Sequence, residues 1–148
     1  MNRAAVAQLV LESAARFGDG NPQQFGFLVG RFSKEGPLEV LSGLIQVFTV
    51  GPAAPEGSDA QELAGALLIH LQPRGEIQLE SVIRAALPRY ELSVEQFPQF
   101  LAAAAGTDKV LQVLNGFDSA DLSTQEARAR DTMLYWLQGR KTIQPASE

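Results

Sequence analysis

The sequence predicts an all-α protein that folds as one domain over residues 1–148. Apolar residues recur at spacings of three, four and seven along almost the whole chain, which is the pattern of helices with one buried face. Glycine, proline or helix-capping residues interrupt that pattern at intervals of roughly 10 to 15 residues, the usual length of a short helix. A chain of 148 residues, 45% of them hydrophobic, is long enough to bury a core without a metal ion or a disulfide.

About eight helices are expected from these stripes, each a run of apolar residues that falls on one side of a helix. Asn21 and Pro22 open the second, because asparagine caps a helix N-terminus and proline is tolerated in the first turn. Three serines are followed three residues later by Gln or Glu, a pattern that predicts capping boxes: Ser58–Gln61, Ser93–Gln96 and Ser123–Glu126. Gly75, Gly106 and Gly139 mark expected helix ends. In chain order, the stripes span 6–17, 25–32, 38–48, 63–71, 79–86, 97–104, 110–114 and 123–139.

The chain also matches itself. The segment LEVLSGL at 38–44 recurs as LQVLNGF at 111–117, and Gln24-Phe25 recurs as Gln96-Phe97, at offsets of 73 and 72 residues. All matches are collinear, which predicts a tandem duplication of a four-helix unit over residues 2–75 and 76–141, followed by a flexible tail at 142–148. Chance alignment of helical stripes is the competing interpretation. A duplicated unit of short helices favours a solenoid-like stack, with a compact helical bundle as the alternative.

Charge and residue usage exclude several classes of function. Twelve Lys and Arg against seventeen Asp and Glu give a net charge of -5, which disfavours binding to nucleic acid. The longest apolar run, 63–69, is far shorter than the roughly 20 residues of a membrane-spanning helix, so no membrane association is expected. The chain has no cysteine and one histidine, so we assign no catalytic residue, metal site or cofactor. Lack of cysteine fits a reducing compartment, and the cytoplasm is the expected location.

His70 is a candidate pocket residue, because it alone normally titrates near neutral pH. No Ser, Asp or Glu pattern identifies an orienting partner for it, so a structural role is favoured over a catalytic one. The pair Gly26 and Gly30 has a spacing that predicts close approach of a neighbouring helix.

The last helix carries the candidate interface. Tryptophan, tyrosine and methionine are over-represented at interface centres, and basic residues lie close by. The competing interpretation is that this helix is covered by the rest of the chain. Arg140 and Lys141 extend the basic patch, or simply compensate the helix dipole. The candidate residues are Arg128, Arg130, Met133, Tyr135 and Trp136.

The leading hypothesis is therefore a non-enzymatic helical interaction or adaptor module that binds another protein, and possibly a second copy of itself as a homodimer. The alternative is a small helical enzyme or ligand-binding protein with a pocket between the two repeats that involves His70. A third hypothesis is a nucleic-acid accessory protein that uses the C-terminal basic patch.

Overall fold

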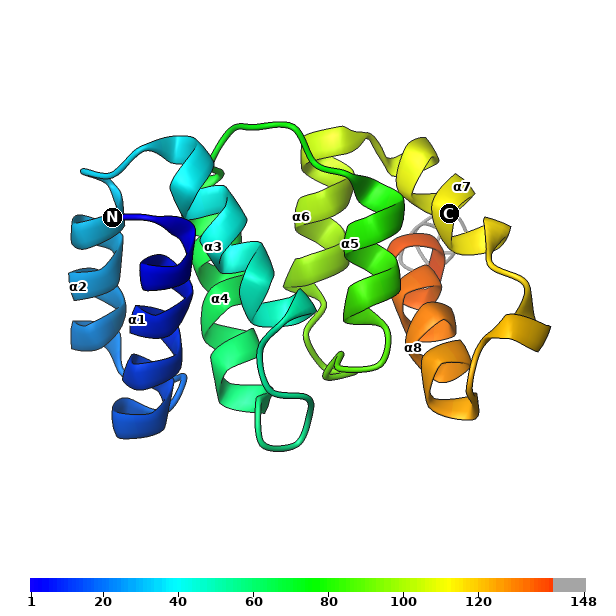
Figure 1. Cartoon of the computed structure of the whole chain (residues 1–148), viewed down its shortest axis with the longest axis horizontal. Helices are drawn as coiled ribbons and strands as arrows, with labels where there is room; N and C mark the ends of the chain where they lie inside the picture. The colour runs from blue at the N-terminus through cyan, green and yellow to red at the C-terminus, as the bar shows by residue number, and fades with distance from the viewer. Residues whose placement is uncertain (140–148) are drawn as a thin grey trace, which may run out of the picture.

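The computed structural model describes residues 1–139, and within them every regular element is a helix (Figure 1). The predicted fold class is confirmed. The elements, in chain order, are α1 (Arg3–Phe17), α2 (Pro22–Phe32), α3 (Pro37–Thr49), α4 (Ser58–Leu71), α5 (Leu79–Ala86), α6 (Gln96–Ala105), α7 (Thr107–Gly116), the 3-10 turn η1 (Ser119–Asp121), α8 (Thr124–Leu134) and the π-helical turn η2 (Tyr135–Gly139).

The helices form two layers that run along the long axis of the molecule. In one layer α1 packs against α3, α3 against α5, and α5 against α7. In the other, α2 packs against α4, α4 against α6, and α6 against η2. From α1 to α5, each helix thus contacts the second helix after it in the chain, which is the order of neighbours in a solenoid. Figure 1 shows α2 at one end of this stack and α7 and α8 at the other.

Helix starts follow the sequence signals only where no distant group competes for the capping side chain. Asn21 accepts a hydrogen bond from the Gln24 amide at 2.9 Å, and Ser123 forms a complete capping box with Glu126. The other two predicted boxes are wrong, because α4 and α6 begin without a side-chain cap bond. The hydroxyls of Ser58 and Ser93 instead donate to carboxylates in other parts of the chain.

Two helix ends also bear on the predictions. Helix α4 stops at Leu71, four residues before Gly75, because Gln72 adopts a left-handed conformation at φ 46° and Pro73 follows it. The π-helical turn η2 continues α8 as far as Gly139, the last described residue, so the helix end expected there stays a prediction. The tail predicted at 142–148, and the candidate basic residues Arg140 and Lys141, lie outside the described residues.

One core joins the two halves of the chain. The rings of Phe48 and Phe97 stack at 4.1 Å between centroids, and Tyr90 packs beside Phe97. Helix α1 packs against both α3 and α4, whereas its proposed counterpart α5 packs chiefly against α7 and α3. The tandem duplication therefore stays a prediction. Within residues 1–139 no helix has the length and apolarity needed to traverse a bilayer.

Candidate functional site

The structure separates the five residues predicted to form an interface. Met133 has 0% of its surface exposed and belongs to the core of the described chain. Its side chain is not available to a partner, which corrects the expectation that it faces one. The reason is packing: Ala129 and Met133, one helical turn apart, are the two residues of α8 that are fully covered.

Trp136 is half-buried and tied to the segment between α5 and α6. Its indole Nε1 donates to the Leu92 carbonyl oxygen at 3.0 Å. In the same segment the Tyr90 hydroxyl donates to the Val94 carbonyl at 2.7 Å, and burial raises the pKa of Tyr90 above its usual range. Trp136 therefore fixes η2 against this segment, and its one hydrogen-bond donor is used inside the protein.

Arg130 also bonds within the chain. Its guanidinium donates to the Phe117 carbonyl at 3.1 Å and to the Ser119 hydroxyl at 2.9 Å, and it forms an ion pair with Asp131 at 2.6 Å. These bonds hold the turn between α7 and α8 in place. Arg130 is therefore a positioning residue for the surface beside it.

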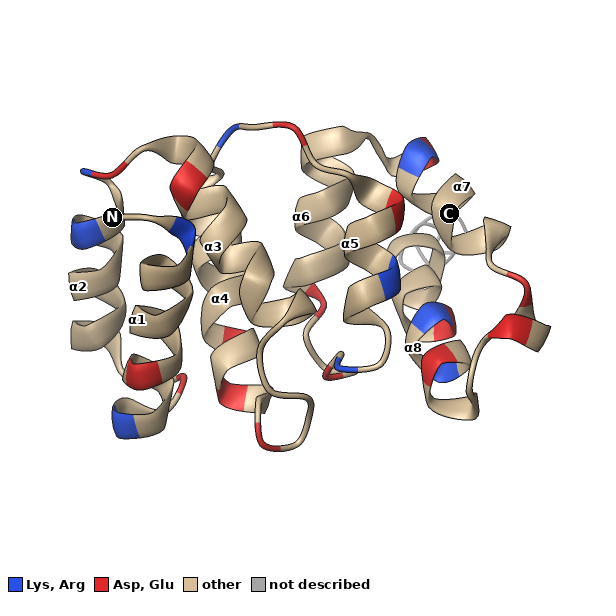
Figure 2. Cartoon of the chain, viewed as in Figure 1, with Lys and Arg blue, Asp and Glu red and all other residues tan. Residues whose placement is uncertain are grey.

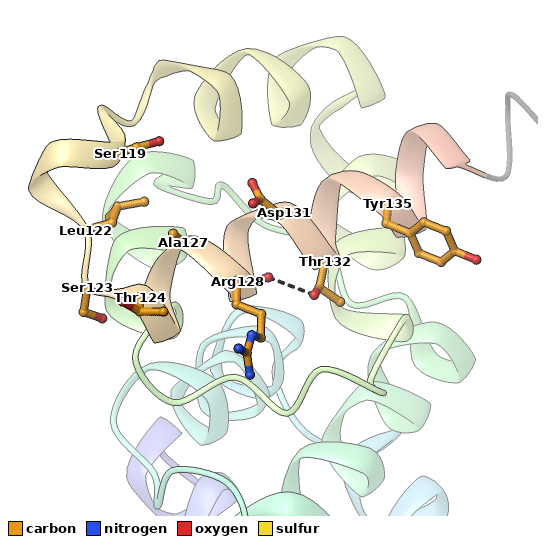
Figure 3. A pocket seen from close by; sticks show the side chains of 9 residues that line it. All are labelled: Ser119, Leu122, Ser123, Thr124, Ala127, Arg128, Asp131, Thr132 and Tyr135. Atoms are coloured by element: carbon orange, nitrogen blue, oxygen red, sulfur yellow. Dashed lines mark hydrogen bonds between the residues drawn. The ribbon is translucent and has the colours of Figure 1, made fainter.

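Arg128 and Tyr135 remain at the surface and line the same groove (Figure 3). Arg128 is exposed, and no hydrogen bond or ion pair to its guanidinium is found among residues 1–139. Figure 3 shows Arg128 extending from one side of α8, with Asp131 and Ser119 on the other side. A hollow of about 580 Å³ follows α8 and is lined by Ser119, Leu122, Ser123, Thr124, Ala127, Arg128, Asp131, Thr132 and Tyr135.

A second hollow, of about 550 Å³, lies on the other flank of Arg128. It shares Arg128 and Thr124 with the first, so we treat the two together as the α8 groove. Glu91 lines the second hollow together with Arg128, and a hydrogen bond from the Ser58 hydroxyl holds the pKa of this carboxyl below its usual range. The second hollow is lined by Ala54, Pro55, Tyr90, Glu91, Leu92, Thr124, Gln125 and Arg128.

The α8 groove combines hydroxyl groups and an aromatic ring with Arg128, a cation that has no partner among residues 1–139. A guanidinium binds carboxylates through two parallel hydrogen bonds, and it keeps its charge at every physiological pH. The Tyr135 ring, 55% exposed, adds apolar contact area at the η2 end of the groove.

His70 lies apart from this groove, on the exposed side of α4. Its ring meets Phe25 of α2 edge to face, at 5.6 Å between centroids. A half-enclosed cavity of about 320 Å³ does lie between the predicted halves, but His70 is not among its lining residues. We call this cavity the Arg74 pocket. It is lined by Ile69, Gln72, Pro73, Arg74, Gly75, Phe100, Ala103 and Ala104.

Sequence reasoning missed a polar network around Gln61, a fully buried residue. Its side-chain amide donates to the Arg89 carbonyl at 2.8 Å, and its oxygen accepts the Glu91 amide, also at 2.8 Å. The signal was present in the sequence: Gln61 lies three residues before Ala64 and seven before Leu68, on the apolar face of α4. This network holds the 89–91 segment, and with it one wall of the α8 groove.

Glu62 and Ser93 extend the network to the surface. The Ser93 hydroxyl donates to Glu62 at 3.1 Å. Desolvation raises the pKa of Glu62, and the nearby carboxylates of Asp19, Glu91 and Asp59 add to this effect. Among residues 1–139 no three Asp, Glu or His side chains gather in a way that could hold a metal ion. No family model, curated protein or solved structure matches the chain.

Proposed function

We propose that this protein is an interaction module whose α8 groove binds an extended segment of a partner protein, with a carboxylate of that segment on Arg128. The observation that carries the proposal is the exposed Arg128 guanidinium, which has no partner within residues 1–139 and lines both hollows. A chain crossing both hollows would pass directly over this side chain.

Charge supports the choice of an acidic segment. The protein carries a net charge of -5, so anions are repelled on average and bind only where a cation stands free of neighbouring carboxylates. Two acids line the groove: Asp131 pairs with Arg130, and Glu91 accepts hydrogen bonds from the hydroxyls of Ser58 and Ser93. Arg128 is therefore left to a partner's carboxylate, for which a guanidinium is the best geometric match.

Preorganisation supports the choice of this groove as the binding surface. Trp136 pins η2 to Leu92, and Arg130 pins the turn at Phe117. The two ends of the groove are thus held before any partner arrives, which lowers the entropic cost of binding.

Selection of short peptides displayed on phage tests the proposal. Peptides selected on the wild-type protein should contain Asp or Glu, and Arg128→Gln should weaken their binding at least tenfold, about 1.4 kcal/mol, in a fluorescence titration. The control is Lys109→Gln, which removes one positive charge from an exposed side chain on α7 that does not line the groove. Selection that yields no binder, or binders that Arg128→Gln leaves unaffected, would contradict the proposed function.

A second candidate function is the binding of a small carboxylic acid in the Arg74 pocket. The observation that favours it is an apolar wall of Phe100, Ala103 and Ile69 facing an exposed arginine. At about 320 Å³ the cavity lies at the small end of ligand sites. Benzoate and hexanoate, titrated in an NMR experiment, should shift resonances around Phe100, and Ala103→Trp should abolish the shifts by filling the space. Shifts that persist in Ala103→Trp would exclude this pocket.

A further inference from the structure

Two opposite charges line the second hollow of the α8 groove without pairing with each other. Arg128 of α8 and Glu91 of the segment between α5 and α6 both line this hollow of about 550 Å³. Within residues 1–139 neither side chain forms an ion pair. The hydrogen bonds that the Glu91 carboxylate accepts come from neutral hydroxyl and amide groups. Both charges therefore remain uncompensated beside one hollow.

Hydrogen bonds from inside the fold fix the position of Glu91. Its carboxylate accepts the Ser58 hydroxyl at 2.6 Å, and its backbone amide donates to the buried Gln61 at 2.8 Å. A hydroxyl donor stabilises a carboxylate without cancelling its charge, and the bond from Ser58 holds the pKa of Glu91 below its usual range. Glu91 therefore stays ionised at neutral pH and presents a fixed anion to whatever occupies the hollow.

Arg128 belongs to a different element, which is itself anchored. Helix α8 begins with the capping box at Ser123, and beyond its other end Trp136 of η2 bonds the Leu92 carbonyl at 3.0 Å. That bond joins η2 to the residue next to Glu91. The fold thus sets the spacing of the two charges before a partner binds, which lowers the entropic cost of contacting both.

The surroundings of Glu91 are acidic, which bears on the choice of partner. Figure 2 shows acidic residues at the start of α4 and in the loop before it. The Ser93 hydroxyl lies 3.1 Å from the carboxylates of both Glu62 and Glu91, so the acidic start of α4 adjoins the hollow. A segment with acidic residues alone would gain the contact with Arg128 but would be repelled by these carboxylates. A basic residue beside the acidic one removes that conflict.

We propose that the partner segment carries a basic residue near its acidic residue and bridges the second hollow, with the carboxylate on Arg128 and the cation on Glu91. The inference rests on the proposed function, whose acidic contact it keeps, and it makes Glu91 a specificity-determining residue. A hollow of this volume is about 10 Å across, the length of about three residues of extended chain. The two charged residues of the partner should therefore lie within three positions of each other. Ala54, Pro55 and Leu92 also line the hollow and offer apolar contact to the aliphatic parts of the segment.

The contact with Glu91 is expected to be modest in strength. Water already solvates charges at an exposed site, so an ion pair formed there gains little. Loss of the Glu91 charge should therefore weaken binding about three- to fivefold, less than the loss expected for Arg128→Gln. Added salt should weaken the contact further, because it screens exposed charges.

Selection from a phage library of nonapeptides with a fixed central Asp tests the inference. On the wild-type protein, Lys and Arg should be enriched about threefold or more, relative to the starting library, within three positions of the Asp. The enrichment should disappear on Glu91→Gln, whose amide oxygen can still accept the Ser58 hydroxyl. It should persist on Glu12→Gln, which removes one negative charge from an exposed side chain on α1 that does not line the groove. Lack of enrichment, or enrichment that persists on Glu91→Gln, would overturn the inference.

A double-mutant cycle with one selected peptide separates bridging from a simple cation site. In a fluorescence titration, replacing the basic residue of the peptide by Gln should weaken binding about threefold or more to the wild type, and less than about twofold to Glu91→Gln. Replacing its Asp by Asn should weaken binding about tenfold to the wild type and little to Arg128→Gln. A peptide whose affinity depends on the basic residue but not on the Asp would show a cation site at Glu91 alone, which contradicts bridging.

Failure of this inference and failure of the proposed function give different results. Peptides that depend on Arg128 but contain no basic residue would leave the acidic contact standing and overturn only the bridge to Glu91. Selection that yields no Arg128-dependent peptide would overturn both. The substitutions made in the peptide need no folded variant of the protein, so they decide the question even where Glu91→Gln is destabilised.

Discussion

Replacing Gln61 by leucine should destabilise the protein although the new side chain is apolar and similar in size. The buried Gln61 side chain bonds the Arg89 carbonyl and the Glu91 amide, each at 2.8 Å. The Arg89 carbonyl keeps a second donor, the Ala54 amide at 3.0 Å. The Glu91 amide has no other hydrogen-bond acceptor among the described residues. The variant thus leaves one backbone donor unsatisfied and loses two hydrogen bonds.

The size of the effect follows from these two losses. Each hydrogen bond contributes about 1 kcal/mol, and an unsatisfied, partly buried amide costs about 1 to 3 kcal/mol. Burying leucine instead of an amide offsets part of the sum. The free energy of unfolding should therefore fall by about 2 to 3 kcal/mol, which lowers the thermal midpoint by roughly 5 to 10 °C in a domain of this length.

Gln61→Glu tests the hydrogen-bond reasoning more sharply, because its effect depends on pH. The introduced carboxyl accepts the Glu91 amide in either form, but it donates to the Arg89 carbonyl only when protonated. Its pKa in the folded state is therefore raised above the unfolded value of about 4.3. Stability is then lost as pH rises above that value, so the variant should resemble the wild type near pH 4 and be weaker by more than about 1.4 kcal/mol at pH 7.

Urea unfolding followed by circular dichroism measures both variants. Midpoints should fall with unchanged slopes, since the exposed area on unfolding does not change. A loss below about 1 kcal/mol for Gln61→Leu, or a Gln61→Glu variant with the same deficit at pH 4 and pH 7, would refute the assignment of Gln61 as the bridge to the 89–91 segment.

Three further outcomes are expected. Met133→Ala should cost about 2 to 5 kcal/mol in urea unfolding, because Met133 is fully buried, whereas a surface residue would cost little. Trp136→Phe should lower stability by about 1 kcal/mol through loss of the bond to the Leu92 carbonyl, and unchanged stability would show that the bond is not formed in solution. Glu62→Gln should raise stability at pH 7 and not at pH 3, because the pKa of Glu62 is raised in the folded state and its ionised form opposes folding. The opposite pH trend in the same unfolding experiment would contradict this sign.

The sequence predicted the helices well wherever a local signal was unambiguous. Asn21, Pro22 and the Ser123–Glu126 box open their helices because the groups that they bond lie within one turn. Ser58 and Ser93 have the same local pattern and failed. Their hydroxyls bond to Glu91 and Glu62 across the fold, and no local rule foresees that competition.

The candidate site was predicted in part. Arg128 and Tyr135 were named from composition, and they do line one groove. Met133 was named as an interface candidate, with a covered helix as the alternative, because three apolar residues in one turn leave the buried face ambiguous. The polar walls of the groove come from η1 and the 87–95 segment, which have no periodicity from which their position could be inferred.

By itself the sequence determined the fold class and the approximate bounds of the helices, because the spacing of apolar residues and the residues that start and stop helices act over a few positions. Only the tertiary structure decided which faces stay open. Gly43 and Gly26 are both helical glycines, yet one lies against Val6 and the other meets nothing. Phe25 and Phe27 are two residues apart, but Phe25 packs partly against the core whereas Phe27 is 53% exposed. A side chain's burial depends on neighbours far away in the chain, and their arrangement is fixed only when the layers pack.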